Sequence, residues 1–485
     1  MHIPSLLVVC AICLLVVIGI VAAPPFEETV SQRYSVRSYT TDPISSQQLL
    51  SVLWAAYGYT GGSRVLPQIG SDYSLIIFVV NATGSFRYNP ETNSLAVYNT
   101  AVNKETVRSD DSNWPSDANV VLVIVWDQTK MNNQYFASVE AGCAVQNVHL
   151  AAISQNLGTC CVGTINSDGL RNDLGLPSTM IPILVMPLGY PTSPYPTATP
   201  DYGRMTGNLP RVQYSAGSFT DALSNMDYVQ AWSAQDLSLQ ELSQLLWAAY
   251  GYSSTGHRTT PSSNGIYPLT IYMSNSTGIY RYTAESHSIT QIQAGDKRSD
   301  IATACDNQLW AASAPAIFVI ALDLSYNGGD TGDGGALPHE WIEVDAGCVV
   351  QQILLEASAV NLSANVVAKG LESWNGGGAQ TLRSILGLAS SIIPLYIVPV
   401  GHNYATPTPS PSPSPTSSPS SSPTSSPSSS PTQPPTPSSS PSQPPTPTPK
   451  PQADEFSFME LVYAIAAGVV IIIIVAVALV LKKRR

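Results

Sequence analysis

An internal duplication is the feature that most constrains how this chain can fold. Residues 45–59 read SSQQLLSVLWAAYGY and residues 238–252 read SLQELSQLLWAAYGY, an offset of 193. A second pair, EAGCAVQN at residues 140–147 and DAGCVVQQ at residues 345–352, recurs at an offset of 205. Two segments that recur in the same order predict two copies of one domain.

Each copy mixes helical and strand patterns. The first repeated segment has apolar residues at helical spacing, with Ser45 and Ser238 as expected N-caps and a glycine at each C-terminal end. The second continues as a long helix that we expect to be amphipathic, and β-type apolar runs flank it in both copies. These runs are residues 120–126 and 181–188 in the first copy and residues 316–322 and 392–400 in the second. The pattern predicts two α+β domains, residues 26–215 and 216–403, packed as a pseudo-two-fold dimer within one chain, so that the head is monomeric.

The two ends of the chain predict a membrane-anchored protein. Residues 1–23 have the apolar run and small-residue cleavage pattern of a signal peptide, although the absence of Lys or Arg before the run leaves an uncleaved anchor open. Residues 461–481 are continuously apolar, about 21 residues or ~32 Å as a helix, enough to cross a bilayer. The basic tail 482–485 then predicts a cytoplasmic C-terminus and an extracytoplasmic head on a single-pass helix.

Composition shifts sharply before that apolar run. Residues 405–452 are almost wholly Pro, Ser and Thr, which cannot bury a core and favour an extended stalk. Over the whole chain only 11% of residues are charged and the net charge is −12. Since phosphate backbones are bound through clustered Lys and Arg, nucleic acid is not an expected partner.

Five motifs of the head, taken in order, resemble the nitroreductase superfamily, and most closely its SagB-type, azoline-dehydrogenase-like branch. The motifs are RYSVR at residues 33–37, the LLWAAYG helix, the EAGC helix, NLGTCCVG at residues 156–163, and PSSNGIYPL at residues 261–269. The resemblance covers the head alone. It implies a nitroreductase-like fold and an FMN cofactor bound where two protomers meet, with arginines on phosphate and ribityl oxygens and a glycine-bearing turn near the flavin.

The two copies have lost complementary parts of this pattern. Met226, Tyr228 and Gln230 stand in the second copy where the first has Arg33, Ser35 and Arg37, and the glycines of the loop are also replaced there. The Pro-Ser segment, residues 261–264, is instead intact in the second copy and is replaced by residues 67–70 in the first. The resemblance therefore implies one composite flavin site and one site that has lost the motif. The implied FMN-binding residues are Arg33, Ser35, Arg37, Gly158, Thr159, Pro261, Ser262, Ser263, Asn264 and Arg211.

Other residues leave alternatives open. Arg211, with Arg204, resembles the family's C-terminal basic segment, or is a solvated linker residue. Cys160 and Cys161 are either a redox dithiol or ordinary loop residues, and Cys143 and Cys348 are either a disulfide or buried thiols. Residues 328–335 are either a flexible loop or a Ca²⁺ loop, and Tyr267 is either a core residue or a site residue. The histidines are scattered and predict no metal site.

Two functions follow from these observations. The first is a membrane-anchored, extracytoplasmic, FMN-dependent oxidoreductase acting on a small-molecule or peptide redox substrate, for which no catalytic residue can be named. The second is a flavin-free surface binding or adhesion module that reuses the fold, because a fold does not by itself establish a function.

Overall fold

The computed structural model describes residues 23–107, 114–325, 338–374 and 376–403. The predicted signal peptide, stalk, membrane helix and basic tail, and the glycine-rich segment 328–335, lie outside these residues. No helix within the described ranges is both long and apolar enough to cross a membrane.

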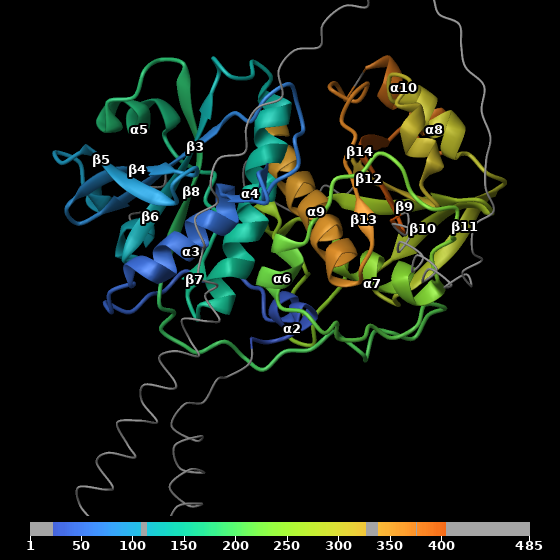
Figure 1. Cartoon of the computed structure of the whole chain (residues 1–485), viewed down its shortest axis with the longest axis horizontal. Coiled ribbons are helices and arrows are strands. Elements are labelled where there is room, and N and C mark those ends of the chain that lie inside the picture. The colour runs from blue at the N-terminus through green and yellow to red at the C-terminus, as the bar shows by residue number, and fades with distance from the viewer. Residues whose placement is uncertain (1–22, 108–113, 326–337, 375, 404–485) are drawn as a thin grey trace, which may run out of the picture. The chain divides into compact units, whose positions relative to one another are not determined.

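Both repeats are built on a six-stranded antiparallel sheet with the same strand order (Figure 1). In the first repeat the order is β5-β4-β3-β6-β8-β7, and in the second it is β11-β10-β9-β12-β14-β13. The strands of the first sheet are β3 (Leu75–Asn81), β4 (Gly84–Asn89), β5 (Ser94–Asn99), β6 (Val120–Asp127), β7 (Gly158–Thr159) and β8 (Met180–Gly189). Those of the second are β9 (Leu269–Asn275), β10 (Gly278–Thr283), β11 (Ser288–Ala294), β12 (Ala316–Asp323), β13 (Ser363–Ala364) and β14 (Ile392–Gly401). The four apolar runs are thus confirmed as strands β6, β8, β12 and β14, and the two α+β repeats are confirmed with them.

The repeated LLWAAYG segment forms matched helices, α3 (Ser46–Tyr57) and α7 (Leu239–Tyr250). Each begins with a capping box, in which the hydroxyl of Ser45 or Ser238 accepts from the third residue and that residue's side chain accepts from the cap. Each ends at a glycine, where a side chain would overlap the tryptophan of the same helix. The predicted caps are confirmed in both repeats.

Apart from two long helices at the interface between the repeats, the other α-helices are shorter. They are α2 (Phe26–Ser31), α5 (Ser167–Leu174), α6 (Phe219–Ser224), α8 (Arg298–Ala304) and α10 (Gly377–Ile385), and a small hairpin, β1 (Tyr59–Thr60) with β2 (Ser63–Arg64), follows α3.

The two repeats meet along α4 (Gln134–Ser154) and α9 (His339–Ala359), which lie side by side between the two sheets (Figure 1). The helices cross at Gly142 and Gly347: a methyl group on Gly142 would overlap the carbonyl of Val344 and come within 2.8 Å of the Gly347 Cα. A methyl group on Gly347 would in turn overlap the carbonyl of Val139. The EAGC and DAGC motifs therefore supply the close contact of the predicted pseudo-dimer.

The expectation that these helices are amphipathic was wrong. Every residue of α4 from Ala137 to Ile153 is buried, and so is α9 from Ile342 to Ala357. Each helix packs against its own sheet on one side and the partner repeat on the other, which leaves no face for solvent. Because the interface lies inside one chain, neither helix has the solvent-exposed polar face that a helix at a domain surface displays.

Candidate functional site

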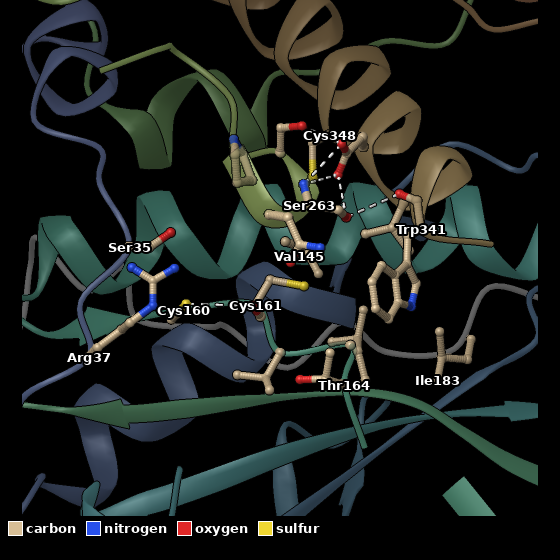
Figure 2. A pocket seen from close by; sticks show the side chains of 18 residues that line it. Ser35, Arg37, Val145, Cys160, Cys161, Thr164, Ile183, Ser263, Trp341 and Cys348 are labelled. Atoms are coloured by element: carbon tan, nitrogen blue, oxygen red, sulfur yellow. Dashed lines mark hydrogen bonds between the residues drawn. The ribbon is translucent and has the colours of Figure 1, made fainter. Parts of the chain in front are cut away.

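A cavity of about 220 Å³ is lined by both repeats (Figure 2). The first repeat contributes Ser35, Arg37 and residues 160–164, and the second contributes residues 261–264 together with the face of α9 that carries Trp341, Asp345 and Cys348. The structure thus brings together two segments that are more than 220 residues apart: residues 35–37 of the first copy, here called the Arg-Ser segment, and the Pro-Ser segment of the second.

The Arg-Ser segment is held in place by strand β7. The backbone N–H of Val36 donates to the carbonyl of Thr159 at 2.9 Å. A side chain at Gly158 would approach Val36 to 2.6 Å, so the glycine permits this close packing. Ser35 and Arg37 flank Val36 and both line the cavity, where Figure 2 shows the Arg37 guanidinium beside the Ser35 hydroxyl.

Arg33 is buried next to this segment, only 2% exposed. Its Nε and Nη2 donate to the carbonyl of Arg258 at 3.1 and 3.0 Å, which joins the first repeat to the loop before the Pro-Ser segment. Its Nη1 is buried and has no acceptor among the described residues. Burial lowers the pKa of Arg33, which shows the cost of placing this cation away from water without a counter-charge.

Two neutral groups in the same region also lack partners. Thr159 Oγ1 and His149 Nε2 are buried and make no hydrogen bond to any described residue. Burial lowers the pKa of His149 well below its usual value, and the positive charges of Arg33 and Arg37 lower it further. His149 is therefore neutral. Buried polar groups are normally paired, so these two atoms and the Nη1 of Arg33 are exceptions that lie close to the Arg-Ser segment.

The Pro-Ser segment is positioned by Asp345, one of the residues of α9 that line the cavity. The Ser262 hydroxyl donates to Asp345 Oδ2 at 2.6 Å, and the Ser263 hydroxyl donates to Oδ1 at 3.0 Å. The Ser263 backbone N–H also donates to this carboxylate at 3.0 Å. Burial raises the pKa of Asp345 to about 7, although these hydrogen bonds oppose the rise.

Asp345 was missed as a site residue from the sequence. The available signal was the acidic residue that opens both the EAGC and the DAGC motif. Its counterpart Glu140 accepts from Tyr57 Oη and from the N–H and hydroxyl of Ser74 instead, and so holds no Pro-Ser segment. Tyr267, the possible site residue beside this segment, has φ of 56° and donates its backbone N–H to the Ser262 hydroxyl at 2.9 Å. Its ring packs against the core.

Four of the predicted site residues do not line this cavity. Arg33, Gly158 and Thr159 lie behind its wall, buried against the Arg-Ser segment. Arg211 lies elsewhere, with its guanidinium 5.7 Å from the ring centroid of Tyr202. Arg204 makes an ion pair with Asp201 at 3.0 Å. The two arginines of the linker are thus engaged with their neighbours and not with the cavity.

The cysteines of the described residues are all free thiols. Cys143 donates to the carbonyl of Gly347 at 3.3 Å and Cys348 donates to that of Gly142 at 3.2 Å, across the helix crossing. Burial raises the pKa of Cys160 and, more strongly, of Cys161. The raised pKa values keep both thiols protonated, and a protonated thiol is a poor nucleophile, which favours the interpretation of ordinary loop residues.

The pseudo-symmetric position holds a different cavity, of about 490 Å³. Gln68 and Gly70 replace the Pro-Ser residues there, and Tyr228 and Gln230 replace Ser35 and Arg37. Met226, in place of Arg33, accepts a weak hydrogen bond from Gln351 through its sulfur. The loss of the motif inferred from the sequence thus corresponds to a cavity with different chemistry.

Comparisons with known proteins agree on one family. The model of the nitroreductase family matches residues 30–190 and 229–402, one match in each repeat. A curated protein of Methanocaldococcus jannaschii named "Putative nitroreductase MJ1384" is 30% identical over 188 residues, 37% of this chain and 89% of that protein.

A crystal structure titled "putative nitroreductase" from Anabaena variabilis superposes with a TM-score of 0.59 at 16% identity, over 79% of this chain and 94% of that one. The likeness extends across both repeats and supports the fold. Because the family model covers well over half of the sequence, this chain belongs to the nitroreductase family.

Proposed function

We propose that the chain is an FMN-dependent oxidoreductase that binds one flavin per chain, in the cavity between its repeats. The observation that carries this proposal is the sorting of the motifs: Ser35 and Arg37 from the first repeat line the same cavity as Ser262 and Ser263 from the second. The matching cavity has none of these residues.

The donors around the cavity suit the polar half of FMN. Arg37 presents an exposed guanidinium, and the buried Arg33 keeps one N–H group without an acceptor. A phosphate or ribityl oxygen in the cavity would accept from Arg37, and its negative charge would lie on the side of the wall behind which Arg33 is buried without a counter-charge. The Ser35 hydroxyl adds a neutral donor beside them.

The opposite wall suits a planar ring system. Val145, Cys161 and Trp341 line this part of the cavity, and a side chain on Gly163 would come within 2.9 Å of the Trp341 ring. When bound, a flavin supplies reversible hydride or two-electron transfer. The residues of the chain would bind it, orient it and exclude water from one of its faces.

We further propose that the head works outside the cytoplasm, held by residues 461–481 on the stalk of residues 405–452. The support is the sequence pattern of an apolar run followed by four basic residues. Nicotinamide cofactors are scarce in that compartment, so the electron partner in this proposal is a small redox carrier, a quinone or a peptide substrate. The paired repeats also favour a monomeric head, because each copy already meets its partner within the chain.

The alternative is a flavin-free binding module. It is favoured by the matching cavity, where the motif residues are replaced although the surrounding repeat keeps the same strand order.

Flavin content tests the two functions against each other. The full-length chain, purified with FMN supplied, is expected to be yellow and to hold one flavin. Arg37→Ala should weaken FMN binding by about 1.5–3 kcal/mol, and Ser262→Ala by about 0.5–1.5 kcal/mol, because charge-assisted hydrogen bonds are stronger than neutral ones.

The matched controls are Gln230→Ala and Gln68→Ala, at the equivalent positions of the other cavity, which should leave flavin content unchanged. Two flavins per chain, or equal sensitivity of both positions, would refute the single composite site. A folded chain that takes up no FMN would favour the binding module.

A further inference from the structure

Each repeat contains one arginine surrounded by tyrosines. Arg64 in the first repeat and Arg258 in the second stand at matching positions, and each donates Nη1 to a carbonyl at the end of the preceding helix at 2.8 Å. Each guanidinium also lies over three rings at 4.0–5.6 Å. The rings are Tyr57, Tyr59 and Tyr73 around Arg64, and Tyr250, Tyr252 and Tyr267 around Arg258.

The two arginines differ in their acidic partner. Arg258 Nη2 makes an ion pair with Glu285 at 3.2 Å. Glu91 is the matching residue of the first repeat, but it makes no ion pair with Arg64, and Arg64 Nη2 has no acceptor among the described residues. The nearby carboxyl of Glu140 is bonded to Tyr57 and Ser74 instead, and burial raises its pKa to about 7. One repeat thus supplies its own carboxylate and the other does not.

The cavities beside the two arginines differ in volume, and the larger one lies beside the arginine that lacks an ion pair. The cavity at Arg258, which Glu285 also lines, has a volume of about 120 Å³. The cavity at Arg64 has a volume of about 610 Å³ and is lined by both Arg64 and Glu91. It shares Tyr59, Arg64 and Tyr73 with the 490 Å³ cavity that has lost the flavin motif. Space for a ligand is therefore present where the acidic partner is withdrawn.

The lining sets the chemistry of that ligand. The cations Arg64, Arg87 and Lys130 are matched by three carboxylates, so the lining has no net charge and does not favour a polyanion. The carboxylates are Asp72, Glu91 and Asp127. The tyrosine rings and two buried strand residues, Leu75 and Ile77, provide an apolar wall. One carboxylate on an apolar or aromatic body matches this combination.

We propose that the first repeat carries a second ligand site, in which Arg64 binds a small organic monocarboxylate with an apolar or aromatic body. The ligand carboxylate takes the place at Arg64 that the Glu285 carboxylate takes at Arg258. The ligand body lies against the tyrosines, toward the cavity that contains Tyr228. This site does not depend on flavin binding and is distinct from the composite cavity at Arg37.

Benzoate is a suitable probe, with benzamide as its neutral counterpart of the same shape. Titration calorimetry on the full-length chain is expected to show one benzoate bound and benzamide at least tenfold weaker. Arg64→Gln should weaken benzoate binding at least tenfold, whereas Arg258→Gln should leave it within about twofold. Arg258→Gln is the matched control for folding, because it removes the same hydrogen bond to a helix carbonyl and an ion pair besides.

Two further variants locate the site. Arg37→Ala should not change benzoate binding, and Glu91→Gln should leave it within about twofold. Benzoate binding that persists in Arg64→Gln, or is lost in Arg37→Ala, would place the ligand elsewhere and overturn the proposal. Binding that appears only in Glu91→Gln would show that Glu91 closes this site in solution as Glu285 closes its counterpart, and would also overturn it. Thermal unfolding of both arginine variants separates loss of binding from loss of fold.

Discussion

The two repeats are nearly interchangeable where they touch and different where they form cavities. At the crossing of α4 and α9, Gly142 and Gly347 meet, and each cysteine that follows donates to the opposite glycine carbonyl. On one side of this crossing lies the cavity with Ser35, Arg37 and the Pro-Ser segment, and on the other lies the cavity with Tyr228, Gln230 and Gln68. The helix crossing has thus kept the symmetry of the duplication, because a change in either glycine would disturb the packing of both repeats. The two cavities are lined by different residues, so a change in one cavity does not require a change in the other.

The symmetric crossing is expected to give the largest effects. Gly142→Ala and Gly347→Ala each place a methyl group against the backbone of the opposite helix, which can avoid it only if the repeats separate. We expect each change to lower the free energy of unfolding by about 3 kcal/mol or more, at the upper end of the range for overpacking. Thermal or urea unfolding of the full-length chain measures this.

The two glycine variants should be destabilised equally, since each methyl group meets the equivalent backbone atoms of the opposite helix. Gly377→Ala, in a helix where a methyl group meets no neighbouring atom, is the control and should be nearly neutral. A large difference between Gly142→Ala and Gly347→Ala would show that the two glycines contribute unequally to stability although their contacts are equivalent.

The next largest effect is expected on FMN binding, in which the two cavities differ. Arg33→Met tests it, because it gives the first repeat the residue that the second has at this position, Met226. This change removes the buried cation and its two hydrogen bonds to the Arg258 carbonyl. FMN affinity should fall by about 10-fold, the equivalent of about 1.4 kcal/mol, because the change removes a positive charge behind the cavity wall and the link to the loop before the Pro-Ser segment. Flavin absorbance during FMN titration measures it.

Met226→Leu is the matched variant in the other repeat and should leave FMN affinity unchanged. An equal loss in both variants would indicate that they act through the stability of the interface. Unchanged FMN affinity in Arg33→Met would show that this arginine serves only to join the repeats.

The sequence predicts the repeats and their strands well, because these depend on local patterns. Helix caps at Ser45 and Ser238 and the apolar runs of β6 and β12 are properties of short segments. It also predicts which segments meet, since the pseudo-two-fold relation follows from the duplication. It does not predict what buried side chains are bonded to: Arg33 uses two of its donors on the Arg258 carbonyl, and Gly158 serves to pack Val36.

Partners in space explain the other misses. The burial of α4 and α9 depends on the second repeat, which a helical pattern read alone does not include. Asp345 differs from Glu140 by one methylene group, yet it positions the Pro-Ser segment because Ser262 and Ser263 lie within its reach. The contrast between Arg64 and Arg258 is likewise invisible in the sequence, because Glu91 and Glu285 are both present and only one of them forms an ion pair.

The smallest expected effect is the pH dependence that Asp345 gives to the composite cavity. The pKa of this carboxyl is raised from 3.8 to about 7 in the folded chain, so folding favours its protonated form. Its contribution to stability is therefore full below about pH 4 and is lost as the pH rises toward 7. The ionised form accepts from Ser262 and from both donors of Ser263, whereas the protonated form has fewer acceptor sites to hold them.

FMN affinity should therefore rise by a few-fold between about pH 6 and pH 8 in the wild-type chain, as stability falls slightly over the same range. Asp345→Asn should remove this rise, because an amide does not titrate and cannot accept all three hydrogen bonds.

Glu140→Gln is the matched control. The pKa of the Glu140 carboxyl is also raised to about 7, but this carboxyl accepts hydrogen bonds from Tyr57 and Ser74, which do not line the composite cavity. It should change the pH dependence of stability and leave the pH dependence of FMN affinity intact. If Glu140→Gln instead flattened the FMN profile as Asp345→Asn does, the two acids would act through the shared helix crossing, and the asymmetry of the cavities would not extend to their proton binding.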